Sequence, residues 1–561
     1  MRNVKLFAMA LIFCMAFPCF AAGQALAADN SPDTLTLDQV VDNVTNHERV
    51  LLTELRKYSP VVETYIQNMK PDPDLGAVPS GDHYFLGRLD MSAGTIKDRS
   101  YLKQAGLLRR MMDTLTSVYE VHYVPLGFMG MIVLDGQSFD RSHYDFQFVR
   151  RDFLGDVRCL VLDVHPKKGS GQGRFTGRIW VEDQNYNIIR FNGSYGPPPR
   201  FGHYLHFDSW RLNAQPGLWL PAYVYSEESA MPYGLGITRK LRFKAQTRLW
   251  GYDHGIGTHS SELSSIVVDS DKVQDRSAAA QDASPIEAQR EWQRMAEDNV
   301  LERLQKAGLL APEGEVDKVL EQVITNLVVT NKLDIQPEVR ARVLLTDPLE
   351  SFTVGHTIVI SRGLIDTLPD EASLATVLAE ELAHIVLGHN IDTKYAFSDR
   401  MLFPDEKVFD RIHMRDDKRE EAEADTKALD LLRHSPYADK LTSAGLFLKA
   451  LQNRQKDLPH LLSAHLGNPM QYDGHLRMNT LMQSAPQLQK RNADQIAALP
   501  LGGRIHVNIW NDQVELEKST RIQLVSASEK MPFEVTPVFP YVSRYMTDDA
   551  KQKVASANGG K

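Results

Sequence analysis

The sequence predicts an α+β fold, with an N-terminal domain built on an antiparallel curved β-sheet and a mainly α-helical second domain that holds a small sheet. Two patterns support this prediction. Between Tyr84 and Trp250, short runs alternate between apolar and polar residues, which is the period of a β-strand. After residue 284, apolar residues recur every three or four positions, as on one face of a helix. A short β segment is predicted near the C-terminus, where alternation returns.

Length and charge limit the class of protein. The chain has 561 residues, which is enough for two or three domains. Its formal net charge of −9 gives no reason to expect a nucleic-acid partner.

The first 27 residues are predicted to be a cleaved signal peptide. Arg2 and Lys5 precede an apolar run over residues 6–20, and the small residues at 25–27 suit signal peptidase. That run is too short to span a bilayer comfortably and no later run is long enough, so we expect a periplasmic or secreted mature chain. Only Cys159 follows the signal peptide, so no intrachain disulfide is expected.

Residues 28–267 are assigned to the N-terminal β-rich domain. Residues 35–70 are predicted to be helical, because apolar residues such as Val40, Val44 and Leu51 fall at helical spacing. Strands are predicted at residues 144–149, 159–164, 178–181, 188–191 and 241–243. Each strand is expected to have one buried face and one face in contact with water, as in many antiparallel sheets.

Residues 177–190 form a predicted strand–turn–strand with the sequence Gly-Arg-Ile-Trp-Val-Glu-Asp-Gln-Asn-Tyr-Asn-Ile-Ile-Arg. This hairpin resembles one in the curved half-barrel of outer-membrane lipoprotein carriers. An ordinary β-hairpin explains the same residues equally well. The resemblance implies a concave face that could hold a lipid chain or an apolar peptide.

The second domain is assigned to residues 285–490, after a small and polar linker at 268–284. Ser284, Pro285 and Glu287 form a helix start, and the helix is predicted to run to about Lys306. The elements predicted next are a helix at 316–327, strands at 342–345 and 356–361, and a short helix at 364–368.

Residues 491–561 are assigned to a C-terminal β extension and tail. Residues 503–511 and 514–524 are predicted to form a hairpin. The proline-containing residues 531–537 are predicted to lie along a sheet edge, and the tail from Thr547 to be frayed.

The chemistry is expected on a helix that ends near His389. Its apolar stripe consists of Leu374, Leu378, Leu382 and Ile385. On another face Glu380 and His384 stand at positions i and i+4, one turn apart, with Glu381 beside them. This is the spacing of H-E-x-x-H, in which two ligands hold zinc and the Glu activates water, with Glu380 in the place of the first His.

A second helix, at residues 418–432, places Glu421 and Asp425 on one face. Alone, it would be interpreted as a solvated acidic helix. A catalytic zinc ion, however, needs three protein ligands, and the first helix supplies at most two. Glu421 could be the third ligand, and Asp425 could orient one of the ligands through a hydrogen bond without contacting the metal ion. About thirty residues separate the helices and could form a lid or pack against the helix flanks.

The two motifs together resemble metallopeptidase family 48, which includes prenyl-endopeptidases, membrane heat-shock proteases and periplasmic chaperone-proteases. That family carries H-E-x-x-H-x-x-x-x-H and, further on, E-x-E-A-D. This chain has Glu-Glu-Leu-Ala-His-Ile-Val-Leu-Gly-His at residues 380–389 and Glu-Ala-Glu-Ala-Asp at 421–425. The resemblance covers roughly residues 286–485. The family's later His-Pro/Arg signature is echoed only loosely at residues 475–477, to which we assign no role.

The resemblance implies the roles of the site residues. His384 and Glu421 would be metal ligands, with Glu380 completing the set. Glu381 would be the general base that takes a proton from zinc-bound water and passes it to the leaving amine. His389 would support the site, and we expect its role to be structural.

Glu380 changes the expected chemistry. With Glu380, His384 and Glu421 the ligand set carries two negative charges instead of one, so bound zinc should acidify its water less. More oxygen ligands also favour harder ions such as Mn²⁺. Without a metal ion, the crowded carboxylates should retain a proton. The site could therefore hold Zn²⁺ and work slowly, hold another divalent ion, or hold none.

Two functions follow. The first is an exported zinc-dependent metalloendopeptidase acting on unfolded or envelope proteins, with residues 356–361 as the edge strand on which an extended substrate pairs. The second is a catalytically dead pseudoprotease that acts as a periplasmic chaperone or adaptor.

Overall fold

The structure is a computed structural model that describes residues 35–73, 76–90, 97–100, 130–135, 138–171, 173–196, 204–229, 231–233, 237–239, 243–252, 285–389, 418–464, 466–472, 475–489, 505–516 and 533–545. The predicted signal peptide, the linker at 268–284, the segment between the two motif helices and the tail from Thr547 lie outside these residues.

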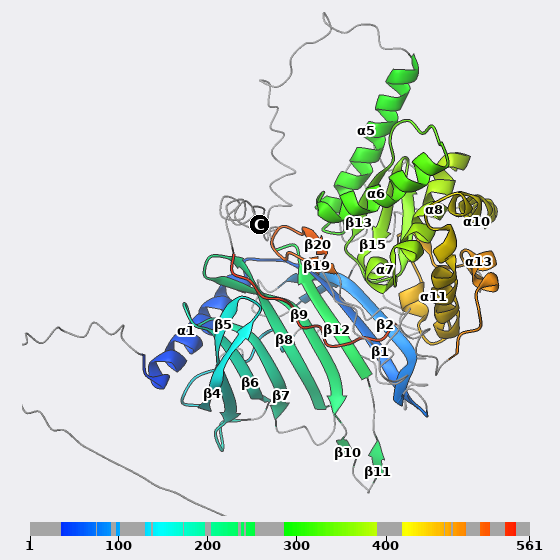
Figure 1. The fold of residues 1–561 in the computed structure, drawn as a ribbon. Coiled ribbons are helices and arrows are strands. Elements are labelled where there is room, and N and C mark those ends of the chain that lie inside the picture. The colour runs from blue at the N-terminus through cyan, green and yellow to red at the C-terminus, as the bar shows by residue number, and fades with distance from the viewer. Residues whose placement is uncertain are drawn as a thin grey trace, which may run out of the picture.

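A large curved antiparallel sheet forms the N-terminal half, as predicted (Figure 1). Its ten strands pair in the order β3-β2-β1-β12-β9-β8-β7-β6-β5-β4, and its two outer strands do not pair with each other in the described part of the chain. The strands are β1 (Val61–Asp72), β2 (Gly76–Asp90), β3 (Lys97–Ser100), β4 (Tyr144–Leu154), β5 (Val157–Pro166), β6 (Arg174–Glu182), β7 (Ile188–Gly196), β8 (Tyr204–Gln215), β9 (Leu218–Ser229) and β12 (Phe243–Trp250). A separate small hairpin consists of β10 (Met231–Tyr233) and β11 (Ile237–Arg239).

Helix α1 (Leu37–Leu55) precedes the sheet and begins with a capping box between Thr36 and Gln39. The predicted helix over residues 35–70 is therefore correct only in its first part. Its second part is strand β1, which pairs with β2 and β12. Pro60 cannot continue a helix, and the β-branched residues that follow it pack well in a sheet.

Both faces of the sheet are covered near its centre, so the prediction of one face in contact with water is wrong for the central strands, whereas the outer strand β4 keeps exposed positions. On one face, α1 and residues 130–135 pack in a hydrophobic cluster with Phe191 and Phe207. On the other face, Trp210 and Trp250 belong to the cluster that forms the core of the helical half. Large aromatic side chains occupy positions that an alternating pattern leaves for polar residues, and their burial needs a second covering layer.

The second half is mainly helical, as predicted (Figure 1). Its helices are α5 (Pro285–Lys306), α6 (Glu315–Thr330), α7 (Arg362–Thr367), α8 (Glu371–Leu387), α10 (Lys418–Arg433), α11 (Leu441–Arg454), α12 (Pro459–Leu462) and α13 (Asn479–Ser484). The predicted helices at 316–327 and 364–368 correspond to α6 and α7. Helix α8 packs against α6, α10 and α11 and lies at the centre of this half.

The small sheet has the strand order β13-β15-β14-β16. Its strands are β13 (Arg340–Leu344), β14 (Glu350–Val354), β15 (Thr357–Ser361) and β16 (Asn468–Pro469). The prediction that residues 356–361 form an edge is wrong, because β15 pairs with β13 on one side and with β14 on the other. Strand β14 is the outer neighbour, it pairs with β16 only at Glu350 and Ser351, and all five of its residues are buried.

The C-terminal part contains a hairpin within the predicted range, formed by β19 (Ile505–Val507) and β20 (Val514–Leu516). Residues 517–524 of the second predicted strand lie outside the described residues. Residues 533–545 form neither helix nor strand. They cross the strands of the large sheet, shown in red in Figure 1, instead of lying along an edge as predicted for 531–537. In the described part of the chain, no helix has the length and apolar character needed to cross a membrane.

A buried polar interface joins the two halves. Glu63 of β1 accepts hydrogen bonds from Arg362 Nη2 and from the Asp347 amide, both at 2.7 Å. Arg362 also donates to Asp347 at 2.8 Å, and Arg248 of β12 forms an ion pair with Asp347. Burial, together with the charge of Asp347, raises the pKa of Glu63 to about 7, against the effects of Arg362 and Arg248.

Candidate metal centre

Helix α8 is firmly capped at both ends. Asp370 accepts a hydrogen bond from the Ser373 amide at 2.9 Å at its start. Gly388 ends the helix in the left-handed conformation, with a φ of 72°. These caps fix the register of the helix, and hence the direction of the side chains that it presents.

The two motif helices bring most of the predicted site residues together. Glu380, Glu381 and His384 are completely or almost completely buried on α8. Helix α10 packs against α8 and places Glu421 Oε1 at 3.9 Å from His384 Nε2. The tips of His384 and Glu421 therefore lie close together and face each other.

Arg477 lies among these carboxylates, although no role was predicted for it from the sequence. Its Nε is 2.5 Å from Glu380 Oε1, and its Nη2 is 2.7 Å from Glu381 Oε1. The same Nε is 3.7 Å from Glu421 Oε2. Arg477 is only 3% exposed, so these ion pairs form away from water, where charges interact more strongly.

Ser351 of β14 completes this network. Its hydroxyl donates to Glu381 Oε1 at 2.7 Å and accepts from Arg477 Nη1 at 3.0 Å. Glu381 Oε1 is therefore bound on two sides. Glu381 Oε2 is buried and has no hydrogen-bond partner among the described residues.

Asp425 fixes the backbone next to Arg477. Its Oδ1 accepts a hydrogen bond from the Met478 amide at 2.9 Å. Met478 has a left-handed backbone with a φ of 55°, which is uncommon for a residue other than glycine. Asp425 thus holds the loop that carries the guanidinium, and its side chain also interacts with Glu380, one of the predicted ligands.

His389 contacts His384, although it lies just beyond the helix. The Nδ1 atoms of the two rings are 2.9 Å apart, so one ring donates a proton and the other accepts it. His389 Nε2 is 3.7 Å from Glu423 Oε2. His389 therefore orients the His384 ring, and Nε2 of His384 is the atom that faces Glu421.

The carboxylates at the site perturb one another. Burial, and then the charges of Asp425 and Glu421, raise the pKa of Glu380 well above its usual range, against the opposing effect of Arg477. Burial also raises the pKa of Asp425. Burial alone would lower the pKa of Arg477, but the charges of Glu380, Glu381 and Glu421 outweigh this effect and raise it.

The residues do not fit a zinc or manganese ion in this arrangement. Among the residues that the structure describes, no group of three or more His, Cys, Asp and Glu side chains is arranged to hold a metal ion. Arg477 explains this, because its Nε contacts Glu380, the residue that should complete a ligand set with His384 and Glu421. A guanidinium and a divalent cation that shared these carboxylates would repel each other at close range.

Sequence reasoning missed Arg477 and Ser351. A signal for Arg477 was nevertheless present in the sequence. Replacing a neutral ligand with Glu380 adds a negative charge to a buried helix, and a buried carboxylate requires a cation or a proton. A search for an unassigned Arg or Lys near the later family signature would have found it.

Residues 311–403 match the model of peptidase family M48. The matched segment includes α6, the strands β13 to β15 and all of α8. It confirms the resemblance found from the two motifs and supports a domain of the metallopeptidase type. No curated protein sequence matches the chain.

Two solved structures align with about two fifths of the chain. A domain assigned to outer-membrane lipoprotein sorting from Vibrio parahaemolyticus is 8% identical, with 40% of this chain and 96% of that chain covered and a TM-score of 0.18. A DUF1329 family protein from Desulfovibrio piger is 13% identical, with 39% and 98% covered and a TM-score of 0.17. The first has the name that the hairpin resemblance led us to expect, but scores this low carry no argument about function.

Proposed function

Because residues 311–403 match peptidase family M48, we propose that this chain is a peptidase-fold protein that binds polypeptides without hydrolysing them. The observation that carries this proposal is the guanidinium of Arg477 between Glu380, Glu381 and Glu421. It provides the positive charge that these carboxylates need, at the place where the peptidase chemistry requires a metal ion.

The position of Glu381 supports the absence of hydrolysis. A general base must accept a proton from the attacking water, with its carboxylate free to reach that water. Here one oxygen of Glu381 is bound by both Arg477 and Ser351, and the residue is fully buried.

The buried edge of the small sheet also supports binding elsewhere than at this site. An extended substrate would need an accessible strand to pair with. Strand β14 is the outer neighbour of β15, and its residues are buried. Ser351 of β14 contacts Glu381. Because β14 is buried, an extended polypeptide could pair with it there only if neighbouring parts of the chain moved away.

A second candidate function is an exported metalloendopeptidase, with altered or weak metal binding. The observation that favours it is the convergence of His384 and Glu421 from separate helices, at 3.9 Å. Hydrolysis by this route would require Arg477 to leave Glu380 and a metal ion to enter. We also propose, from the signal-like N-terminus, that the protein acts in the periplasm or outside the cell.

One experiment separates the two functions. The native chain and Glu381→Gln are incubated with an unfolded protein, with Zn²⁺, with Mn²⁺ and with a chelator. Cleavage is measured by mass spectrometry and suppression of aggregation by light scattering. We expect both proteins to suppress aggregation to the same extent and neither to cleave. Cleavage by the native chain that is lost in Glu381→Gln would instead establish the peptidase.

A further inference from the structure

Residues 533–545 contact the face of the large sheet that carries Trp180, Trp210 and Tyr223, although the segment forms neither helix nor strand. Gln67 of β1 is fully buried, and its side-chain amide donates to the Phe533 carbonyl at 2.5 Å and accepts from the Val535 amide at 2.8 Å. Tyr223 of β9 donates to the Thr536 carbonyl at 3.2 Å. All three hydrogen bonds are made to backbone atoms of the segment, so they do not require a particular side chain there.

The middle of the segment lies beside the Arg190 guanidinium and the two tryptophan rings that it contacts. Arg190 of β7 has its Cζ 4.3 Å from the centre of the Trp180 ring and 4.4 Å from that of Trp210. Phe539 lies against the same guanidinium, at 5.4 Å, and meets Trp210 edge to face at 6.2 Å. A guanidinium held between aromatic rings can bind a further aromatic side chain through cation–π and edge-to-face contacts.

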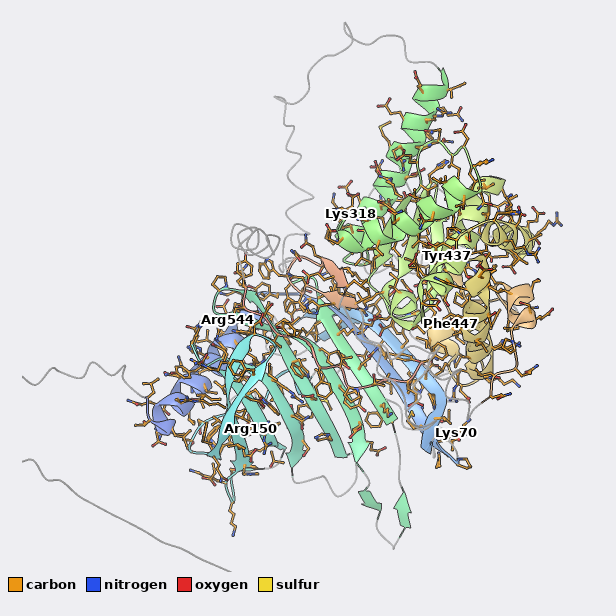
Figure 2. The ribbon with its side chains drawn as sticks, in the orientation of Figure 1. Lys70, Arg150, Lys318, Tyr437, Phe447 and Arg544 are labelled. Atoms are coloured by element: carbon orange, nitrogen blue, oxygen red, sulfur yellow. The ribbon has the colours of Figure 1, made fainter. Side chains whose placement is uncertain are left out.

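The far end of the segment is held by the turn between β4 and β5 and by β6. The Val542 carbonyl accepts from the Asp156 amide at 2.9 Å, next to Gly155, where a Cβ atom would lie 2.3 Å from that carbonyl. Arg544 forms an ion pair with the buried Glu182 at 2.9 Å. Figure 2 shows Arg544 over the large sheet and Phe447, whose ring contacts Phe533 at the other end, in the helical half.

The fit between the segment and this face is incomplete. A cavity of about 70 Å³ is lined by Val538 and Pro540 of the segment and by Tyr223 of the sheet. Trp210 is 1% exposed, yet its indole Nε1 has no hydrogen-bond partner in the described part of the chain. Buried tryptophan N–H groups usually have one. The face thus offers space and a donor that the segment does not use.

We propose that this face is a binding site for extended, proline-containing polypeptide segments, and that residues 533–545 are its resident occupant. Pro537 and Pro540 favour the extended polyproline conformation, which aromatic-lined grooves in other proteins recognise. An incoming segment would keep the backbone bonds to Gln67 and Tyr223, place an aromatic residue on Arg190 and supply an acceptor to Trp210. This inference does not rest on the peptidase-type site.

The test uses the full chain with a specific protease site inserted between Leu516 and Phe533. After cleavage, exchange of the C-terminal piece is measured with a fluorescent peptide of residues 531–546. We expect this peptide to replace the resident piece, and its Phe539→Ala form to bind about ten-fold more weakly, a change of about 1.4 kcal/mol. An unrelated peptide that keeps the Pro, aromatic and Arg spacing should compete. No exchange, equal displacement by a scrambled peptide, or displacement only by a fatty acid would each overturn the proposal.

A second measurement needs no cut. In the intact chain, Phe539→Ala together with Arg544→Ala should loosen the segment and allow the labelled peptide to bind, while the native chain should not bind it. The matched control is Tyr545→Phe, because Tyr545 contacts the sheet through its backbone amide. Folding of each variant is checked by its thermal transition. A folded double variant that fails to bind the peptide would contradict the proposal.

Discussion

Arg477 Nε lies 2.5 Å from Glu380 Oε1, and the two residues are 97 positions apart in the chain. Both side chains are almost completely buried. A buried ion pair gives little net stability compared with apolar residues of the same shape, but removing only one partner leaves an uncompensated charge. Glu380 in place of a ligand histidine and Arg477 beside it are therefore interdependent features of this site.

Arg477→Met should destabilise the folded chain strongly, by about 3–5 kcal/mol, because Glu380 and Glu381 would remain buried without their cation. Urea denaturation measures the change. The matched control is Arg150→Met (Figure 2), which removes an ion pair with Asp152 at a side chain that is 47% exposed and should cost less than about 1 kcal/mol. Equal effects of the two substitutions would show that Arg477 does not balance buried charge.

Removing one buried carboxylate should partly rescue that variant. In the Arg477→Met background, Glu380→Gln should restore at least about 1 kcal/mol, since contacting residues in one network do not contribute additively. Glu423→Gln is the control on α10, because its side chain is 58% exposed. A double-mutant cycle on the free energy of unfolding gives the coupling. A coupling near zero between positions 380 and 477 would contradict the ion pair.

The interface between the halves should become less stable as pH rises from about 4.5 to about 7. Glu63 has its pKa raised from 4.5 to about 7, so in this window the folded chain holds a proton that the unfolded chain has released. The contribution of this group is on the order of 3 kcal/mol. The difference in melting temperature between the native chain and Glu63→Gln, measured from pH 4.5 to pH 8, isolates it. The native chain should lose stability relative to the variant, and parallel curves would refute the assignment.

A pair of glycines in the large sheet should tolerate no side chain. Gly193 and Gly177 are directly opposite on β7 and β6, and a Cβ on Gly193 would lie 2.2 Å from the Thr176 carbonyl oxygen and 2.9 Å from the Phe175 ring. Gly193→Ala should therefore cost about 1–3 kcal/mol through overpacking. The control is Gly81→Ala on β2, where the added Cβ meets nothing within 4 Å. Thermal unfolding should separate the two variants, and similar melting temperatures would count against the strand register.

Local patterns predicted the elements whose signals are local. Helix α8 was predictable because its apolar stripe and its Asp370 cap lie within one short stretch, and α10 because Glu421 and Asp425 follow the same period. Strand β1 was missed because its residues were assigned to the preceding helix, although Pro60 and the β-branched residues after it are local signals for a strand, which the pairing with β2 and β12 confirms.

The contents of the site were only partly predictable. The sequence predicted which carboxylates would meet, because i and i+4 spacing fixes one face of a helix. It did not predict Arg477, because the loop that carries it is held by the long-range contact from Asp425 to the Met478 amide. The burial of β14 depends in the same way on chain segments distant in sequence.

The metal content of the native chain tests the central claim most directly. The purified protein is equilibrated with zinc, passed through a desalting column and analysed by elemental mass spectrometry. The variant Glu380→His with Arg477→Met, which removes the guanidinium and restores the imidazole, is measured in parallel. We predict no zinc above the buffer level in the native chain and retained zinc in the variant. Stoichiometric zinc in the native chain would contradict the claim that Arg477 takes the place of the metal ion.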